Sequence, residues 1–81
     1  MKSKDIRYEE LARAKVQQSR NLVISACSKN GFTIAQQLEV KEGNHTMSVF
    51  LKGALHIDDV QGLYNLRDAL NVAIQQIEKN P

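Results

Sequence analysis

The sequence predicts a small α+β domain with the element order α-β-β-α, an antiparallel β-hairpin packed against two amphipathic helices. Three observations support this. Residues 4–29 contain no Gly or Pro, residues 32–52 alternate between apolar and polar, and residues 58–79 carry apolar side chains at helical spacing. The chain has 81 residues, so we expect one small domain over residues 1–81.

The first helix is predicted over residues 4–29, with Ser3 as its N-cap and Asn30 and Gly31 as its stop. At about 100° per residue its apolar side chains fall within an arc of about 160°. They are Tyr8, Leu11, Ala12, Val16, Leu22, Val23, Ala26 and Cys27. The β-branched residues near Val23 also admit a strand, but the surrounding pattern favours the helix.

The hairpin is predicted over residues 32–52. One apolar set is Phe32, Ile34, Leu38 and Val40, and the other is Met47, Val49 and Leu51, with Phe50 on the opposite side. Residues 42–45 contain Gly43 and Asn44, which suit a short hairpin loop. Residues 33–36 also fit a capping box, so the sequence leaves open whether residues 33–38 are strand or short helix.

The second helix shows the clearest periodicity. Asp58 and Gln61 stand three apart before it, as in a reciprocal cap. Its apolar arc spans about 140° and comprises Val60, Leu63, Leu66, Leu70, Ala73, Ile74 and Ile77. Gly62 lies beside this arc. Glycine inside a helix costs about 1 kcal/mol relative to Ala, which favours a role in close backbone approach, although the cost is lower in the first turns of a helix.

Self-association is expected because so short a chain buries little of its surface. A single cysteine, Cys27, excludes an internal disulfide, and no ligand spacing for structural zinc occurs. We therefore expect a homodimer or higher oligomer, with hairpins paired into a four-stranded sheet across a two-fold axis. A small ligand held between subunits is a third hypothesis for the function.

The sequence favours a cytoplasmic protein, because neither a signal peptide nor a membrane span is recognisable in it. Catalysis is not expected. Cys27 falls on the predicted buried side of the first helix, and His45 and His56 lie in a turn and before the second helix. The neighbouring Asp58 and Asp59 do not face each other on a helix. No catalytic residues, metal site or cofactor are predicted, and no glycine-rich phosphate motif occurs.

Nucleic-acid binding is the alternative function. The formal charge of +2 divides into +4 over residues 1–31 and −2 over residues 32–81. Arg13, Gln17 and Arg20 share a stripe of the predicted first helix and are the candidate contacts with DNA or RNA.

The leading hypothesis is a non-enzymatic protein-interaction module, such as a small bacterial or phage accessory protein that binds and inhibits or modulates a macromolecular partner. Its candidate contact residues are Tyr64, Arg67 and Asn71, which neighbour one another on the second helix. Tyr and Arg are enriched among residues that dominate protein interfaces.

Overall fold

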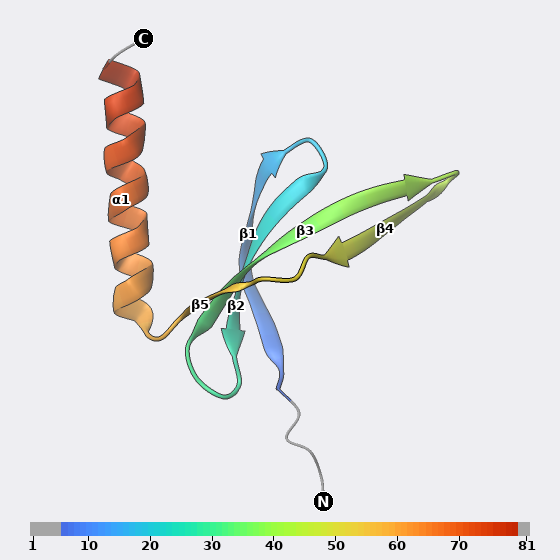
Figure 1. Ribbon diagram of the computed structural model, residues 1–81, viewed down its shortest axis with the longest axis horizontal. Helices are drawn as coiled ribbons and strands as arrows, with labels where there is room; N and C mark the ends of the chain where they lie inside the picture. The colour runs from blue at the N-terminus through green and yellow to red at the C-terminus, as the bar shows by residue number, and fades with distance from the viewer. Residues whose placement is uncertain (1–5, 80–81) are drawn as a thin grey trace, which may run out of the picture.

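The computed structural model describes residues 6–79 and consists of an antiparallel sheet followed by one helix (Figure 1). The elements are β1 (Tyr8–Gln17), β2 (Arg20–Cys27), β3 (Phe32–Glu42), β4 (His45–Phe50), β5 (Leu55–Ile57) and α1 (Val60–Lys79). The strand order is β1-β2-β3-β4, and β5 also pairs with β3. The predicted α-β-β-α order, with a hairpin packed against two helices, is therefore wrong.

The predicted first helix is the β1–β2 hairpin instead, and its proposed cap, Ser3, lies outside the described residues. A turn at Gln18 and Ser19 joins the strands without Gly, Pro or Asn, and no described non-glycine residue has a positive φ. The turn thus needs no special residue type. Two register shifts, between Glu10 and Ala12 and between Lys15 and Gln17, interrupt the alternation of β1. The unmarked turn and the two register shifts therefore obscure the period-two pattern of a β-hairpin in this part of the sequence.

The second hairpin and the second helix are confirmed. β3 pairs antiparallel with β4 around Gly43, whose φ is 63°, and residues 33–38 are strand rather than helix. The helix begins at Val60, but its cap is Asp59 instead of Asp58, because the Gly62 N–H donates to Asp59 Oδ1 at 3.2 Å. Asp58 faces His56, with 3.4 Å between Oδ1 and Nε2.

The edge of β3 that faces away from β2 is shared by β4 and β5, one after the other. The linker 51–54 separates them, and its first N–H, from Leu51, donates to the Gln36 carbonyl at 2.9 Å. β2 pairs with β3 only as far as Leu38, so the remainder of β3 and β4 extends as a two-stranded arm (Figure 1).

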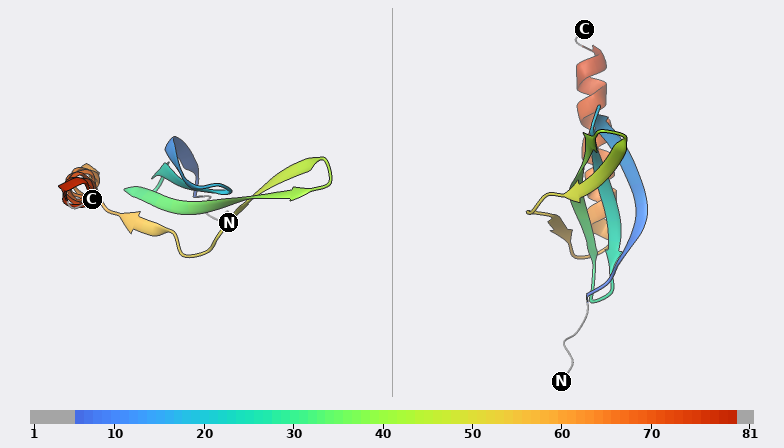
Figure 2. Two further views of the ribbon diagram at one scale, coloured as in Figure 1. Left: turned by 90° about the horizontal axis from the view of Figure 1, so that it is seen from above. Right: turned by 90° about the vertical axis from the view of Figure 1, so that its right-hand side faces the viewer.

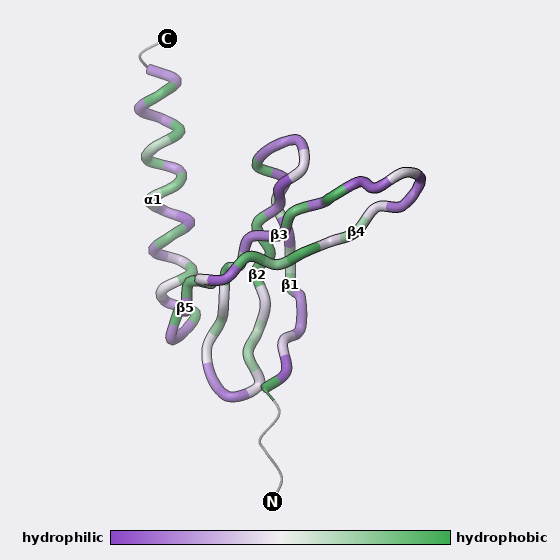
Figure 3. The backbone as a smooth tube through the Cα atoms, turned by 45° about the vertical axis from the view of Figure 1, so that its right-hand side comes forward, coloured by the Kyte–Doolittle hydropathy of each residue, from purple (hydrophilic) through white to green (hydrophobic). Residues whose placement is uncertain are grey.

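The register divides the sheet into two unlike faces, because directly paired residues share a face. The face that we call the apolar face carries Ala12, Ala14, Leu22, Ile24, Ala26, Phe32, Ile34, Leu38, Val40, Met47, Val49, Leu55 and Ile57. Polar residues lie towards its margins and along β3; they are Glu9, Gln17, Arg20, Gln36, Glu42 and His45. The polar face carries Glu10, Arg13, Lys15, Asn21, Ser25, Thr33, Gln37, Glu39, Lys41, Thr46, Ser48 and His56, together with Tyr8, Val23, Cys27, Ala35 and Phe50. The buried residues of the described chain, Asn21, Val23, Ser25 and Gln37, all lie on this face. The same alternation is visible along the strands in Figure 3.

The helix does not cover either face of the sheet. Seen end-on, α1 lies beside the sheet (Figure 2, left), and none of its residues is buried. Among the described residues Val23 is the only buried hydrophobic side chain, at 2% exposure. Packing within the chain thus supplies very little core.

Candidate functional site

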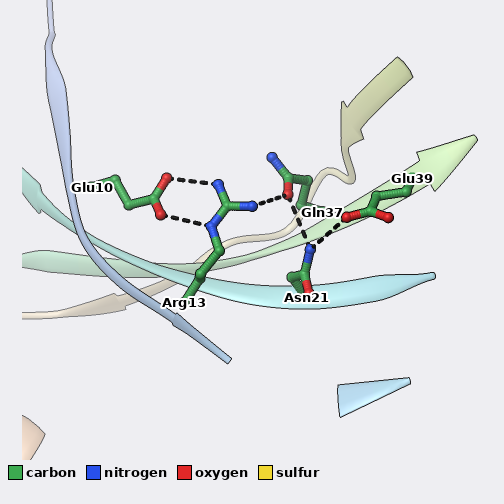
Figure 4. A network of polar contacts seen from close by, with 5 residues as sticks. All are labelled: Glu10, Arg13, Asn21, Gln37 and Glu39. Carbon is green, nitrogen blue, oxygen red and sulfur yellow. Dashed lines mark hydrogen bonds and ion pairs between the residues drawn. The ribbon is translucent and has the colours of Figure 1, made fainter. Parts of the chain in front are cut away.

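The centre of the polar face is held by a network of side chains from three strands (Figure 4). Arg13 on β1 donates from Nε and Nη2 to both carboxylate oxygens of Glu10, at 2.7 and 2.8 Å. Its Nη1 donates to Gln37 Oε1 on β3 at 3.0 Å. Because β2 lies between β1 and β3, the Arg13 side chain crosses β2 at its register partner, Val23.

Asn21 completes this network from β2. Its Nδ2 donates to Gln37 Oε1 and to Glu39 Oε2, both at 3.3 Å. Asn21 and Gln37 are 5% and 6% exposed, so these bonds satisfy amides that would be costly to bury unpaired. The network joins the three strands across the face.

The charges of Arg13 and Glu10 are paired within the network. The hydrogen bonds from Arg13 are the main cause that lowers the pKa of Glu10 below its ordinary value, and the same contact raises the pKa of Arg13. A guanidinium that already chelates a carboxylate has fewer donors left for a phosphate. Arg13 is therefore a structural residue of the sheet.

Beside the network lies a hollow of about 340 Å³ that we call the aromatic hollow. Small side chains of β2 and β3 form its floor, and residues from opposite edges of the sheet form its walls. The lining residues are Ser25, Thr33 and Ala35 with Tyr8, Phe50, Leu51 and Ala54. Tyr8 is 58% exposed and Phe50 is 56% exposed. The volume of the hollow is large enough to hold a planar ring.

The register places the network along one border of this hollow. Glu10 is the partner of Ser25, and Gln37 is the partner of Phe50. The strand cations Lys15 and Lys41 also lie on the polar face, whereas the opposite face carries Arg20 with Glu9 and Glu42. The polar face is thus the more basic of the two.

The predicted nucleic-acid residues are not brought together. Arg13 lies on the polar face, whereas Gln17 and Arg20 pair with each other on the opposite face, beside the β1–β2 turn. Arg20 Nη1 donates to Gln36 Oε1 at 3.1 Å, and its buried Nε has no hydrogen-bond partner among the described residues. Without the first helix, the predicted stripe does not exist.

The predicted protein-binding residues do share one helix. The Arg67 guanidinium lies 5.1 Å from the centre of the Tyr64 ring and forms an ion pair with Asp68 at 3.1 Å. Asn71 is exposed one turn further on. The three residues border the apolar arc of α1.

No protein-family model, curated protein or solved structure matches the chain.

Two further findings concern cofactors and membranes. Residues 6–79 contain no group of three His, Cys, Asp or Glu side chains that could hold a metal ion. Over the same residues, no helix combines the length and apolar character needed to cross a membrane. Cys27, His45 and His56 lie on β2, β4 and β5, on separate parts of the sheet.

Sequence patterns missed Tyr8 and Phe50 as a pair. The two residues are 42 positions apart by number and come together only through the pairing of β1, β2, β3 and β4. One signal was available: Phe50 lies on the side of its strand opposite Met47 and Val49, which places an aromatic ring among polar side chains.

Proposed function

We propose that the chain is a non-enzymatic binding protein whose polar sheet face receives single-stranded nucleic acid at the aromatic hollow. The observation that carries the proposal is the pair of exposed rings, Tyr8 and Phe50, on a face whose other side chains are mostly polar. Bases of unpaired strands stack on such rings, while surrounding cations attract the phosphates.

The composition of the hollow supports a flat ligand. Its floor of Ser25, Thr33 and Ala35 offers small side chains over which a base can lie between the two rings. Lys15 and Lys41 lie on the same face, and Lys52 belongs to the linker beside Phe50. Duplex DNA does not fit this proposal, because its bases are stacked on one another and present only their edges.

The test is binding of a fluorescently labelled oligothymidine and an oligouridine, measured by anisotropy at several salt concentrations. We expect Tyr8→Ala and Phe50→Ala each to weaken binding about tenfold or more, since one stacked base is worth about 1–3 kcal/mol. Tyr8→Phe should bind like the unmodified chain. Affinity should also fall as salt rises.

The matched control is Tyr64→Ala, which removes an aromatic ring of similar exposure (46%) from the helix. It should leave oligonucleotide binding unchanged. Absence of any salt-sensitive binding to either single strand, or equal losses for Tyr8→Ala and Tyr64→Ala, contradicts the proposal.

A partner protein held by Tyr64, Arg67 and Asn71 is the second candidate function. The stacking of Arg67 over Tyr64 on an uncovered helix supports it, because such a pair offers a ready-ordered contact surface. Loss of a nuclease-resistant protein partner on Tyr64→Ala and Arg67→Ala, with oligonucleotide binding absent, favours this candidate. The inhibitor hypothesis stays a prediction.

A further inference from the structure

The apolar face of the sheet and the apolar arc of α1 are only partly covered within one chain. The central residues of the sheet face, such as Ile24 and Ile34, and the helix residues Leu63 and Leu66 are half-buried, whereas the outer residues of both surfaces are exposed. On the sheet, Val40, Met47, Val49 and Leu55 are 41–58% exposed. On the helix, Val60, Leu70, Ile74 and Ile77 are 49–70% exposed. Both surfaces need a partner, because exposed patches of this kind mark contacts with other molecules.

The accessible surface of the whole chain exceeds that of a compact monomer by enough to supply a dimer interface. The chain exposes 6737 Å², whereas a compact monomer of 9.1 kDa exposes about 4,900 Å². Burying the difference on two copies removes roughly 3,700 Å², within the range of about 2,000–5,000 Å² for obligate homodimers. The radius of gyration agrees: it is 15.8 Å, against about 12 Å for a compact chain of this length.

The junction between β5 and α1 directs the helix away from its own sheet. Only Asp58 and Asp59 separate β5 from α1, and Asp59 caps the helix. Gly62 lies so close to β5 that a Cβ atom there would be 2.5 Å from Ile57 Cγ2. These contacts set the direction in which the helix leaves the sheet, which is to one side of it (Figure 2).

The two surfaces suit each other in length. The 20 residues of α1 extend about 30 Å, and the 11 residues of β3, which cross the apolar face, extend about 37 Å. In a two-fold pair, each chain offers one helix and one sheet face, so both surfaces of both chains are covered at once.

We propose that the occupant of the apolar face is the helix of a second copy of this chain. Each α1 lies with Leu63, Leu66, Leu70 and Ile74 on the apolar face of its partner's sheet, and the exchange is reciprocal. The pairing of two hairpins across a two-fold axis was expected because a lone two-stranded sheet is marginally stable. One chain already joins β1, β2, β3 and β4 in a single sheet, so this pairing is no longer needed. The polar faces stay outside the interface.

The first test compares two substitutions on one helix. Leu70 lies in the apolar arc and Val72 lies on the other side, yet both are 55% exposed in the single chain. Size-exclusion chromatography with light scattering should give about twice 9.1 kDa for the unmodified chain and for Val72→Glu. Leu70→Glu should give a monomer or an unfolded chain, identified by circular dichroism.

The second test identifies what the helix contacts. A photoreactive benzoylphenylalanine at position 74 is cross-linked in a mixture of ¹⁴N- and ¹⁵N-labelled chains, and the peptides are identified by mass spectrometry. We expect mixed-isotope cross-links to residues of the apolar face. A monomeric unmodified chain, a folded dimer of Leu70→Glu, or cross-links confined to one chain or to the other helix would overturn the proposal.

Discussion

Arg13 shows how the environment of one side chain decides its role. A basic residue on a charged helix is a candidate phosphate contact, but in the sheet its guanidinium chelates Glu10 and reaches Gln37. Arg13 thus stabilises the association of three strands instead of contacting a phosphate. No spacing rule could have found this, because Gln37 is 24 residues away in the chain.

The Glu10–Arg13 contact predicts an acid dependence of stability. The contact holds the pKa of Glu10 in the folded chain below its ordinary value of 4.5. The unfolded chain therefore binds a proton more readily, so this contribution is present above about pH 4.5 and is lost as the pH falls through the folded pKa. In urea unfolding below pH 5, Glu10→Gln should lose part of the acid destabilisation seen in the unmodified chain.

Glu9→Gln is the control for this measurement, because Glu9 is the neighbouring carboxylate and lies on the opposite face. It should retain the acid dependence of the unmodified chain. Identical pH profiles for Glu10→Gln and the unmodified chain would show that the contact does not form in solution.

At the scale of elements, the sequence predicted the later half of the chain better than the first. The β3–β4 hairpin and α1 follow clear periods, and glycine at 43 marks the turn. The β1–β2 hairpin lacks a turn residue and contains two register shifts, so a helical period fitted it equally well. The β-branched residues near Val23 are the strand signal that the surrounding helical pattern outweighed. The aromatic hollow depends on this hairpin and could not be predicted without it.

A substitution at Gly62 tests the contact between β5 and α1. In most helices Gly→Ala stabilises by about 1 kcal/mol. Here the added methyl group would lie 2.5 Å from Ile57 Cγ2, so we expect Gly62→Ala to destabilise the protein by about 1–3 kcal/mol. Urea unfolding followed by circular dichroism measures the change.

The effect of Gly62→Ala on the free energy of unfolding should change sign when the Ile57 side chain is shortened. In an Ile57→Ala background, Gly62→Ala should stabilise, because Ala lacks the Cγ2 atom. Stabilisation by Gly62→Ala in the unmodified chain would mean that the helix does not contact β5 as described.

At the scale of the whole molecule, the chain is flat and has little core of its own. The principal extents are 55 × 40 × 18 Å, and only Val23 among the described hydrophobic residues is buried. Length and cysteine usage led to the expectation of self-association, but which surfaces meet depends on the register, which fixes the apolar face.

Folding coupled to assembly predicts a concentration-dependent melting temperature. Because dilution favours separated chains, Tm should fall as protein concentration is lowered, and it should do so in parallel by circular dichroism and by scanning calorimetry. A Tm that stays constant over a hundredfold dilution would indicate that the single chain is stable alone.

The outer edge of β1 has a consequence for solubility. A ten-residue edge strand can recruit further strands and grow into fibres. This edge carries Glu9, Glu10, Arg13 and Lys15, and its two register shifts interrupt the regular ladder that another strand would need. We therefore expect this edge to oppose further strand pairing, so that the proposed association through the apolar surfaces ends at a closed dimer instead of a fibre.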